Sequence, residues 1–279
     1  MVKLRPSEQR DVPTLKELWK LAFGDEDSYI DHFFDRYYTP ERMLVLEQDG
    51  VVQAMTAWFD MPLVSAGGEE YPAAYLYAVA TDPARQGRGL AGDLLSFADR
   101  WLREHGFACV TTVPARPDLH VFFGKNRFEE CFVLEQQECH PQSGVEPACM
   151  EPVDARQYGQ LREQALAGTD HVAYAPAALE YQAGVCALSG GGLYWAGENA
   201  CLCVEMSTEG AVVKELLAPQ EEREAILAAV AHMHRAKKYW VRTPWTGAGE
   251  PWRFAMVKWL VSPPAGWDTK TAYLGLAFD

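Results

Sequence analysis

Apolar residues recur at helical spacing in three parts of the first half of the chain, and short apolar runs lie between these parts. This spacing predicts amphipathic helices at residues 12–23, 26–38 and 90–102. Apolar runs predict strands at residues 2–6, 43–47, 51–60, 107–113 and 128–137, with one more ending near residue 82. With a short helix expected at residues 118–125, the predicted order is β-α-α-β-β-β-α-β-α-β.

The same pattern begins again after residues 139–149, a stretch with two prolines and a glycine that indicates a linker. Helices are predicted at residues 155–166, 176–188 and 221–237, and strands at residues 150–153, 193–196, 200–206, 211–217 and 239–242. The second half therefore looks like a copy of the first. We predict an α/β fold with a mixed sheet (α+β) in two tandem domains, residues 1–138 and residues 150–279.

The stretch from Ala78 to Gly92 combines a strand end, a glycine-containing turn and a helix start. Glycines let backbone amides approach a ligand closely, and the first turn of a helix leaves its N–H groups without partners inside the helix. Together with the side chains of Arg85 and Arg88, these amides form a candidate site for an anion such as a pyrophosphate. An ordinary strand–helix turn is the alternative. Gly87, Gly89 and Gly92 have the glycine spacing of the dinucleotide fingerprint, but the next predicted strand, residues 107–113, does not end in the acidic residue that this fingerprint needs. The P-loop fits badly because no Gly-Lys-Ser or Gly-Lys-Thr is nearby.

The same stretch resembles the acetyl-coenzyme A signature of the GCN5-related N-acetyltransferase family, Gln/Arg-x-x-Gly-x-Gly/Ala, which Gln86, Gly89 and Ala91 match. The resemblance implies acetyl-coenzyme A (acetyl-CoA) as co-substrate. It also implies that the turn and helix amides bind the pyrophosphate, while the preceding strand end pairs with the pantetheine arm like an added strand. The cofactor-binding residues so expected are Val79, Ala80, Thr81, Arg85, Gln86, Gly87, Arg88, Gly89, Leu90, Ala91 and Gly92.

The corresponding turn of the second half reads Ala218-Pro219-Gln220-Glu221-Glu222. It has no glycine, and its two carboxylates would oppose a pyrophosphate by like charge. We therefore expect the second copy to be degenerate, to bind no coenzyme A, and to have a structural role. The tandem layout resembles the enhanced-intracellular-survival group of acetyltransferases. We expect no sterol-carrier-like third domain here, and the catalytic role of that group's terminal carboxylate is not carried over to Asp279.

Two catalytic positions depart from the family pattern. The resemblance implies a glutamate where Tyr75 stands, and a tyrosine where Phe123 stands in the segment Phe122-Phe123-Gly124-Lys125-Asn126-Arg127-Phe128. A phenyl ring donates no proton, so Tyr75, Tyr77 and His120 are the candidate catalytic residues. Ordinary packing of the two tyrosines, and a cap or surface role for His120, are the alternatives, and water is another proton donor.

Composition and charge argue against several kinds of partner and cofactor. The formal net charge of −14 argues against nucleic acid as a partner, because the phosphate backbone needs a basic surface. No apolar run approaches the length of a membrane span, and the N-terminus does not read as a signal peptide. Seven cysteines without metal-ligand spacing indicate reduced thiols, so we expect a cytoplasmic location and no metal cofactor. Five of the nine tryptophans follow residue 239, and we interpret them as packing residues rather than a cation cage.

The expected function is direct transfer of an acetyl group from acetyl-CoA to a primary amine of a small molecule or peptide. A catalytically impaired coenzyme A-binding sensor or scaffold is the alternative, motivated by the two departures at Tyr75 and Phe123. We expect no nucleic acid or membrane partner, and self-association into a homo-oligomer is left open.

Overall fold

A computed structural model describes residues 1–142, 144–248 and 250–278. The chain forms two compact units, neither of which is continuous in sequence. Unit 1 consists of Met1–Pro62, Tyr71–Glu130 and Met256–Pro263. Unit 2 consists of Leu63–Glu70, Cys131–Ala255 and Pro264–Asp279. Each unit is described by itself.

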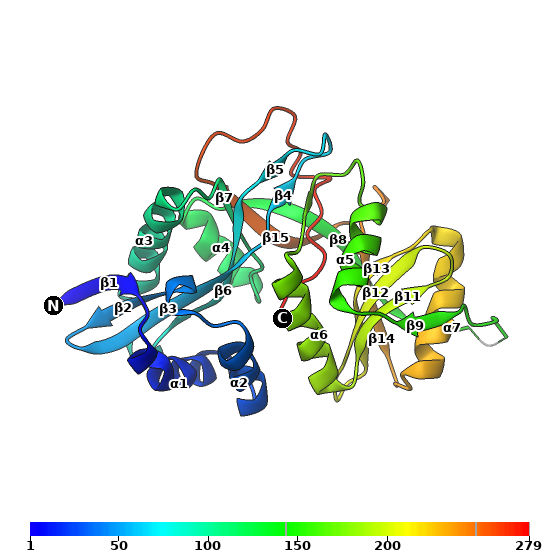
Figure 1. The fold of residues 1–279 in the computed structure, drawn as a ribbon, viewed down its shortest axis with the longest axis horizontal. Helices are drawn as coiled ribbons and strands as arrows, with labels where there is room; N and C mark the ends of the chain where they lie inside the picture. The colour runs from blue at the N-terminus through cyan, green and yellow to red at the C-terminus, as the bar shows by residue number, and fades with distance from the viewer. Residues whose placement is uncertain (143, 249, 279) are drawn as a thin grey trace. The chain divides into compact units, whose positions relative to one another are not determined.

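Unit 1 is a mixed sheet with helices on both faces (Figure 1). Its helices are α1 (Val12–Phe23), α2 (Asp27–Arg36), α3 (Leu90–Glu104) and α4 (Pro117–Lys125). Its strands are β1 (Val2–Pro6), β2 (Met43–Gln48), β3 (Val51–Asp60), β6 (Ala73–Thr81), β7 (Cys109–Thr112) and the end of β15 (Trp252–Trp259). The strand order is β1-β2-β3-β6-β7-β15, and only β6 and β7 pair in parallel.

Unit 2 repeats this arrangement. Its helices are α5 (Ala155–Ala165), α6 (Pro176–Ser189) and α7 (Arg223–Met233). The main strands are β8 (Glu129–Cys139), β9 (Met150–Pro152), β11 (Gly192–Ala196), β12 (Ala200–Met206), β13 (Ala211–Leu217) and β14 (Tyr239–Pro244), and the short strands β4 (Leu63–Val64), β5 (Glu70–Tyr71) and β10 (His171–Val172) form a separate small sheet. The order is β9-β11-β12-β13-β14-β8, with β13 and β14 as the parallel pair. The predicted second copy is therefore confirmed.

The sixth strand of each unit comes from the other half of the chain. In unit 1, Met256–Trp259 of β15 pairs with β7, and in unit 2, β8 pairs with β14. The expected division at residues 139–149 therefore does not coincide with the compact units. The sequence analysis missed β15, because Phe254 to Val257 are all buried and so lack the polar–apolar alternation of a half-exposed strand.

Helix α7 ends earlier than the predicted residue 237. His234 leaves the helical conformation, and its Nε2 lies 2.8 Å from the hydroxyl of Tyr194. The backbone N–H of Ala236 donates to the Tyr239 hydroxyl at 2.9 Å. Tyr194 and Tyr239 both belong to strands. The apolar spacing within the helix segment alone therefore does not predict where α7 ends. No helix in the described residues is long and apolar enough to cross a membrane.

The two faces of the unit 1 sheet bury different side chains. On one face, Leu94 and Leu102 of α3 pack with Leu76 of β6 in an apolar cluster. On the other face, Trp19 of α1 and Phe33 of α2 contact Tyr77 of β6, with ring centroids 5.3 and 5.7 Å apart. Strand β6 is thus held from both sides, which positions the segment that follows it.

A buried ion pair fastens the exchanged strand β15 to unit 1. Nζ of Lys258 lies 2.6 Å from Oδ1 of Asp99 on α3, and the two side chains are 5% and 8% exposed. The same ammonium donates to the backbone carbonyl of Asn126 at 3.1 Å. Burial lowers the pKa of Lys258, although the bond to Asp99 opposes this shift.

Lys258→Met should lower the free energy of unfolding by about 2 kcal/mol, because it leaves the Asp99 carboxylate buried with fewer partners. Denaturant unfolding followed by circular dichroism measures this loss. Lys20→Met is the matched control, since Lys20 and Asp27 are also 2.6 Å apart but are 55% and 75% exposed. Equal losses in the two variants would show that the buried pair does not fasten β15.

Candidate functional site

The pairing of β6 with β7 ends just before a bulge in β6. The parallel pairs run from Ala73–Cys109 to Leu76–Thr112 and go no further. Two residues after Leu76, Ala78 has a φ of +51°, and β6 has one residue more than β3 between the pairs Tyr77–Ala57 and Ala80–Met55. This bulge lies on the β3 side of β6, where it leaves a residue unpaired and bends the strand. Beyond Leu76, the β7-facing backbone edge of β6 has no strand partner among the described residues.

The turn after β6 is held open by two glycines in the left-handed region. Gly87 and Gly89 have φ values of +76° and +81°, which residues with a Cβ rarely adopt. Gly89 caps α3, and the first helical bond of the backbone runs from the N–H of Asp93 to the carbonyl of Gly89. The amides of Leu90, Ala91 and Gly92 consequently have no partner inside the helix, as is usual in the first turn, and such amides can donate to an anion.

The charged side chains of this turn are available to a ligand. Arg85 is half-buried and Arg88 is exposed, and neither forms an ion pair with any residue in the described part of the chain. Nε2 of Gln86 donates to the carbonyl of Thr81 at 3.4 Å, a long bond that spans the turn. The structure thus brings the predicted cofactor-binding residues together around one strand end and one helix start.

The two strand tyrosines lie side by side on the α1–α2 face of β6. The rings of Tyr75 and Tyr77 are 6.5 Å apart, and the residues are 3% and 9% exposed. The hydroxyl of Tyr77 lies 2.7 Å from that of Tyr29 on α2. Tyr29 lies within the helix predicted at residues 26–38, and no local signal links it to Tyr77, 48 residues away. Tyr77 and Tyr29 thus form a hydrogen-bonded pair of phenols beside the bulge.

His120 and Phe123 have different surroundings on α4. Nδ1 of His120 lies 3.0 Å from Oε1 of Glu130 at the start of β8, and the histidine side chain is 18% exposed. A carboxylate in this position orients an imidazole, whose other nitrogen then stays available for proton transfer. Phe123 is 4% exposed and packs in the apolar cluster with Phe128, at a centroid distance of 5.3 Å.

Unit 2 has the same strand bulge but a different turn. The parallel pairs of β13 and β14 end at Val213–Val241, and Lys214 is the extra residue between the pairs with Cys203 and Val204. The expected acidic turn is present, but the Glu222 carboxylate lies against Gly197, where its Oε2 is 2.2 Å from the position of a Cβ built on that glycine. The carboxylate thus fills a gap above the β11–β12 turn.

The chain offers no metal site among its described residues, since no group of three or more histidine, cysteine, aspartate or glutamate side chains is suitably placed. Cys201 and Cys203 are both buried in β12, and Sγ of Cys203 lies 3.4 Å from that of Cys186. Asp279 lies outside the described residues.

A family model described as an acetyltransferase (GNAT) domain matches residues 3–124. A GCN5-related N-acetyltransferase from Kribbella flavida has a similar structure over 93% of this chain and 72% of its own, with a TM-score of 0.70 and 15% identity. A probable N-acyltransferase from Enterococcus faecalis V583 covers 94% of this chain and 73% of its own, with a TM-score of 0.71 and 12% identity. Eis1 from Mycobacterium abscessus covers 93% and 74%, with a TM-score of 0.66 and 11% identity.

The TM-scores of these three structures show that the chain shares their fold. Their low sequence identities leave the substrate open. No curated protein matches the sequence.

Proposed function

We propose that unit 1 is an acyltransferase that transfers the acetyl group of acetyl-CoA to a primary amine, because the family model described as an acetyltransferase (GNAT) domain matches residues 3–124. The observation that carries the proposal is the unpaired strand edge of β6, which leads directly into a turn with two left-handed glycines and the free amides of α3. An extended arm with a pyrophosphate at its end matches both parts of this surface.

In this arrangement the backbone of Val79 to Thr81 pairs with the pantetheine arm, as a β-strand would. The amides of Gly87 to Gly92 donate to the pyrophosphate, and the dipole of α3 favours the negative charge. Arg85 and Arg88, which form no ion pair in the described residues, supply the balancing positive charge.

Acetyl transfer then needs a deprotonated amine and a proton for the departing thiolate. The amine nitrogen forms a bond to the thioester carbon, the carbon–sulfur bond breaks, and the amine's extra proton leaves as the thiolate takes one up. We propose that Tyr77, with Tyr29 behind it, supplies the proton to the sulfur, because their hydroxyls lie 2.7 Å apart beside the bulge. Tyr75 and the His120–Glu130 pair are the remaining candidates.

One observation favours the second candidate function, a coenzyme A-binding sensor or scaffold. Phe123, which stands at the family's tyrosine position, is buried in the apolar cluster and has no group to donate. Release of free thiol from acetyl-CoA, measured with a polyamine, an aminoglycoside, an amino acid and a short peptide as acceptors, separates the two functions. Turnover with any of these amines supports the enzyme, and binding without turnover supports the sensor.

The acceptor is proposed only as a primary amine of a small molecule or peptide. The cytoplasmic location, the structural role of unit 2 and self-association stay predictions.

Gly89→Glu should weaken coenzyme A binding at least tenfold relative to Gly89→Ala. In both variants, a residue with a Cβ in the left-handed region raises the conformational energy of the backbone by about 1–2 kcal/mol. The added Cβ meets no clash in either variant, because nothing lies within 4 Å of a Cβ built at Gly89. Only the glutamate adds a negative charge beside the pyrophosphate, so the difference between the variants isolates charge.

Titration calorimetry with coenzyme A measures both affinities, and the unmutated chain should bind one molecule. Circular dichroism of the same samples checks the fold. Equal affinities of the alanine and glutamate variants would place the phosphates elsewhere.

Initial rates measured against both substrates should give intersecting reciprocal plots, because direct transfer requires acetyl-CoA and amine in one complex. Parallel plots would indicate an acetylated enzyme intermediate and would contradict direct transfer.

Tyr77→Phe should lower kcat by at least about tenfold and leave the coenzyme A affinity unchanged, since it removes the proton donor and keeps the ring. Tyr75→Phe tests the other candidate on the same strand and should leave kcat closer to that of the unmutated chain. If Tyr77→Phe retains full kcat and the unaltered pH profile, the proton comes from another group or from water.

A further inference from the structure

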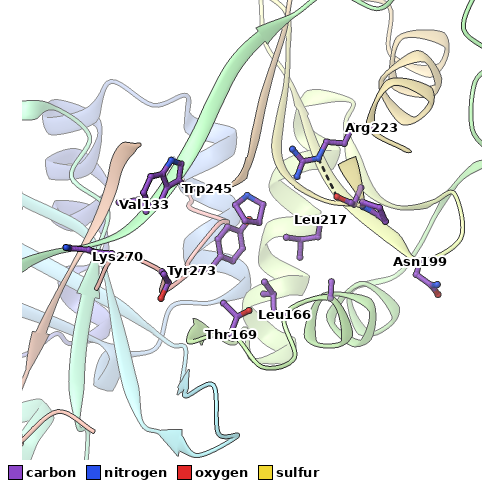
Figure 2. Close-up of a pocket in the computed structure, with 14 residues that line it drawn as sticks. Val133, Leu166, Thr169, Asn199, Leu217, Arg223, Trp245, Lys270 and Tyr273 are labelled. Atoms are coloured by element: carbon purple, nitrogen blue, oxygen red, sulfur yellow. Dashed lines mark hydrogen bonds between the residues drawn. The ribbon is translucent and has the colours of Figure 1, made fainter. Parts of the chain in front are cut away.

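Unit 2 contains a cavity of about 510 Å³ at the place where its parallel strands separate. Leu217 of β13 and Pro244 of β14 line it, and both follow the last pair of the two strands, Val213–Val241. Figure 2 shows Leu217 in this lining together with Arg223, the first residue of α7. The volume falls within the usual range for small-molecule sites.

This position corresponds to the candidate cofactor site of unit 1. In both units a bulge ends the parallel pairing, a turn follows, and a helix begins. A second cavity of about 390 Å³ includes Leu216 and Thr243 in its lining, and Arg223 lines both cavities. Strands β13 and β14 of unit 2 therefore separate as β6 and β7 of unit 1 do, although the turn of unit 2 contains no glycine.

The first cavity is lined by apolar side chains and by two basic ones. Leu166, Leu217 and Tyr273 are 3%, 5% and 2% exposed and form part of its wall. Arg223 and Lys270 also line it, with Lys270 at the opposite end from Arg223 in Figure 2. None of the described lining residues is an aspartate or glutamate. Such a lining is unfavourable for an amine and favourable for an anion.

The guanidinium of Arg223 is available to a ligand. Its Nε donates to the carbonyl of Ala218 at 3.4 Å, and it forms no ion pair with any residue that the structure describes. Neither acidic residue of the turn, Glu221 or Glu222, lines the cavity, and the Glu222 carboxylate lies against Gly197. A planar guanidinium binds a carboxylate through two parallel hydrogen bonds. The turn before α7 has no glycine that would bring backbone amides close to a pyrophosphate, so a ligand with a single carboxylate fits this site better.

We propose that this cavity is a second ligand-binding site, for a small organic carboxylate with an apolar or aromatic body. Its carboxylate pairs with Arg223, and its body lies against Leu217 and Tyr273. The site is separate from the acetyl-CoA site of unit 1 and does not depend on catalysis there.

Titration calorimetry of the full chain with 3-phenylpropionate, and with 3-phenylpropan-1-ol as its neutral counterpart, tests the proposal. We expect one carboxylate site per chain and at least tenfold weaker binding of the alcohol, since a charge-assisted hydrogen bond is lost. Arg223→Gln should reduce the carboxylate affinity to that of the alcohol. Arg235→Gln, at an exposed arginine that does not line the cavity, should leave it unchanged.

Thermal unfolding without ligand shows whether each variant is folded, and Arg223→Lys provides a second variant that keeps the charge and loses the paired hydrogen bonds. Intermediate affinity of Arg223→Lys supports the proposal. The proposal is overturned if acid and alcohol bind equally, if neither binds, or if folded Arg223→Gln binds the acid normally. Competition between coenzyme A and the carboxylate would place the ligand in unit 1 and would also overturn it. Coenzyme A affinity, measured separately, reports on the proposed function.

Discussion

The constraint on which the candidate site depends is the end of backbone pairing between β6 and β7. Backbone N–H and C=O groups in a sheet need partners, and the β7-facing edge of β6 has none from β7 after Leu76, just before the bulge at Ala78. Aromatic rings on one face and the α3 cluster on the other hold the bulged strand in place. The open edge is therefore a fixed feature of the fold and not a frayed strand end.

The two units share a strand arrangement and differ in the turn that follows the bulge. Unit 1 follows its bulge with Gly87 and Gly89, which bring amides to the surface without side chains in the way. Unit 2 follows its bulge with Pro219 and Glu222, and presents Arg223 to the cavity. The backbone frame is common to both units, and the side chains of a short turn decide the chemistry.

The sequence predicted the features that rest on local patterns. The helical spacing of Leu90 to Leu102, the turn of Gln86 to Gly89 and the repetition of the whole pattern all follow from neighbouring residues, and the helix, the turn and the second copy are present. The exchange of β8 and β15 was not predicted, because which strand completes a sheet depends on contacts such as Lys258–Asp99, 159 residues apart in the numbering.

For the candidate catalytic residues, too, the sequence predicted the residues but not their tertiary partners. Tyr75, Tyr77 and His120 were identified by residue type and spacing, whereas Tyr29 and Glu130, their partners and neighbours, are set by tertiary packing. The positive φ of Gly89 was also beyond a sequence argument. It matters because a substitution there strains the backbone whatever its charge.

Hydrogen–deuterium exchange of the full chain with and without acetyl-CoA tests the central claim most directly. The account predicts slower exchange in the peptides that cover residues 79–92, and no change in those that cover residues 214–223. Protection of residues 214–223 instead, or no protection of residues 79–92 at saturating acetyl-CoA, would contradict it.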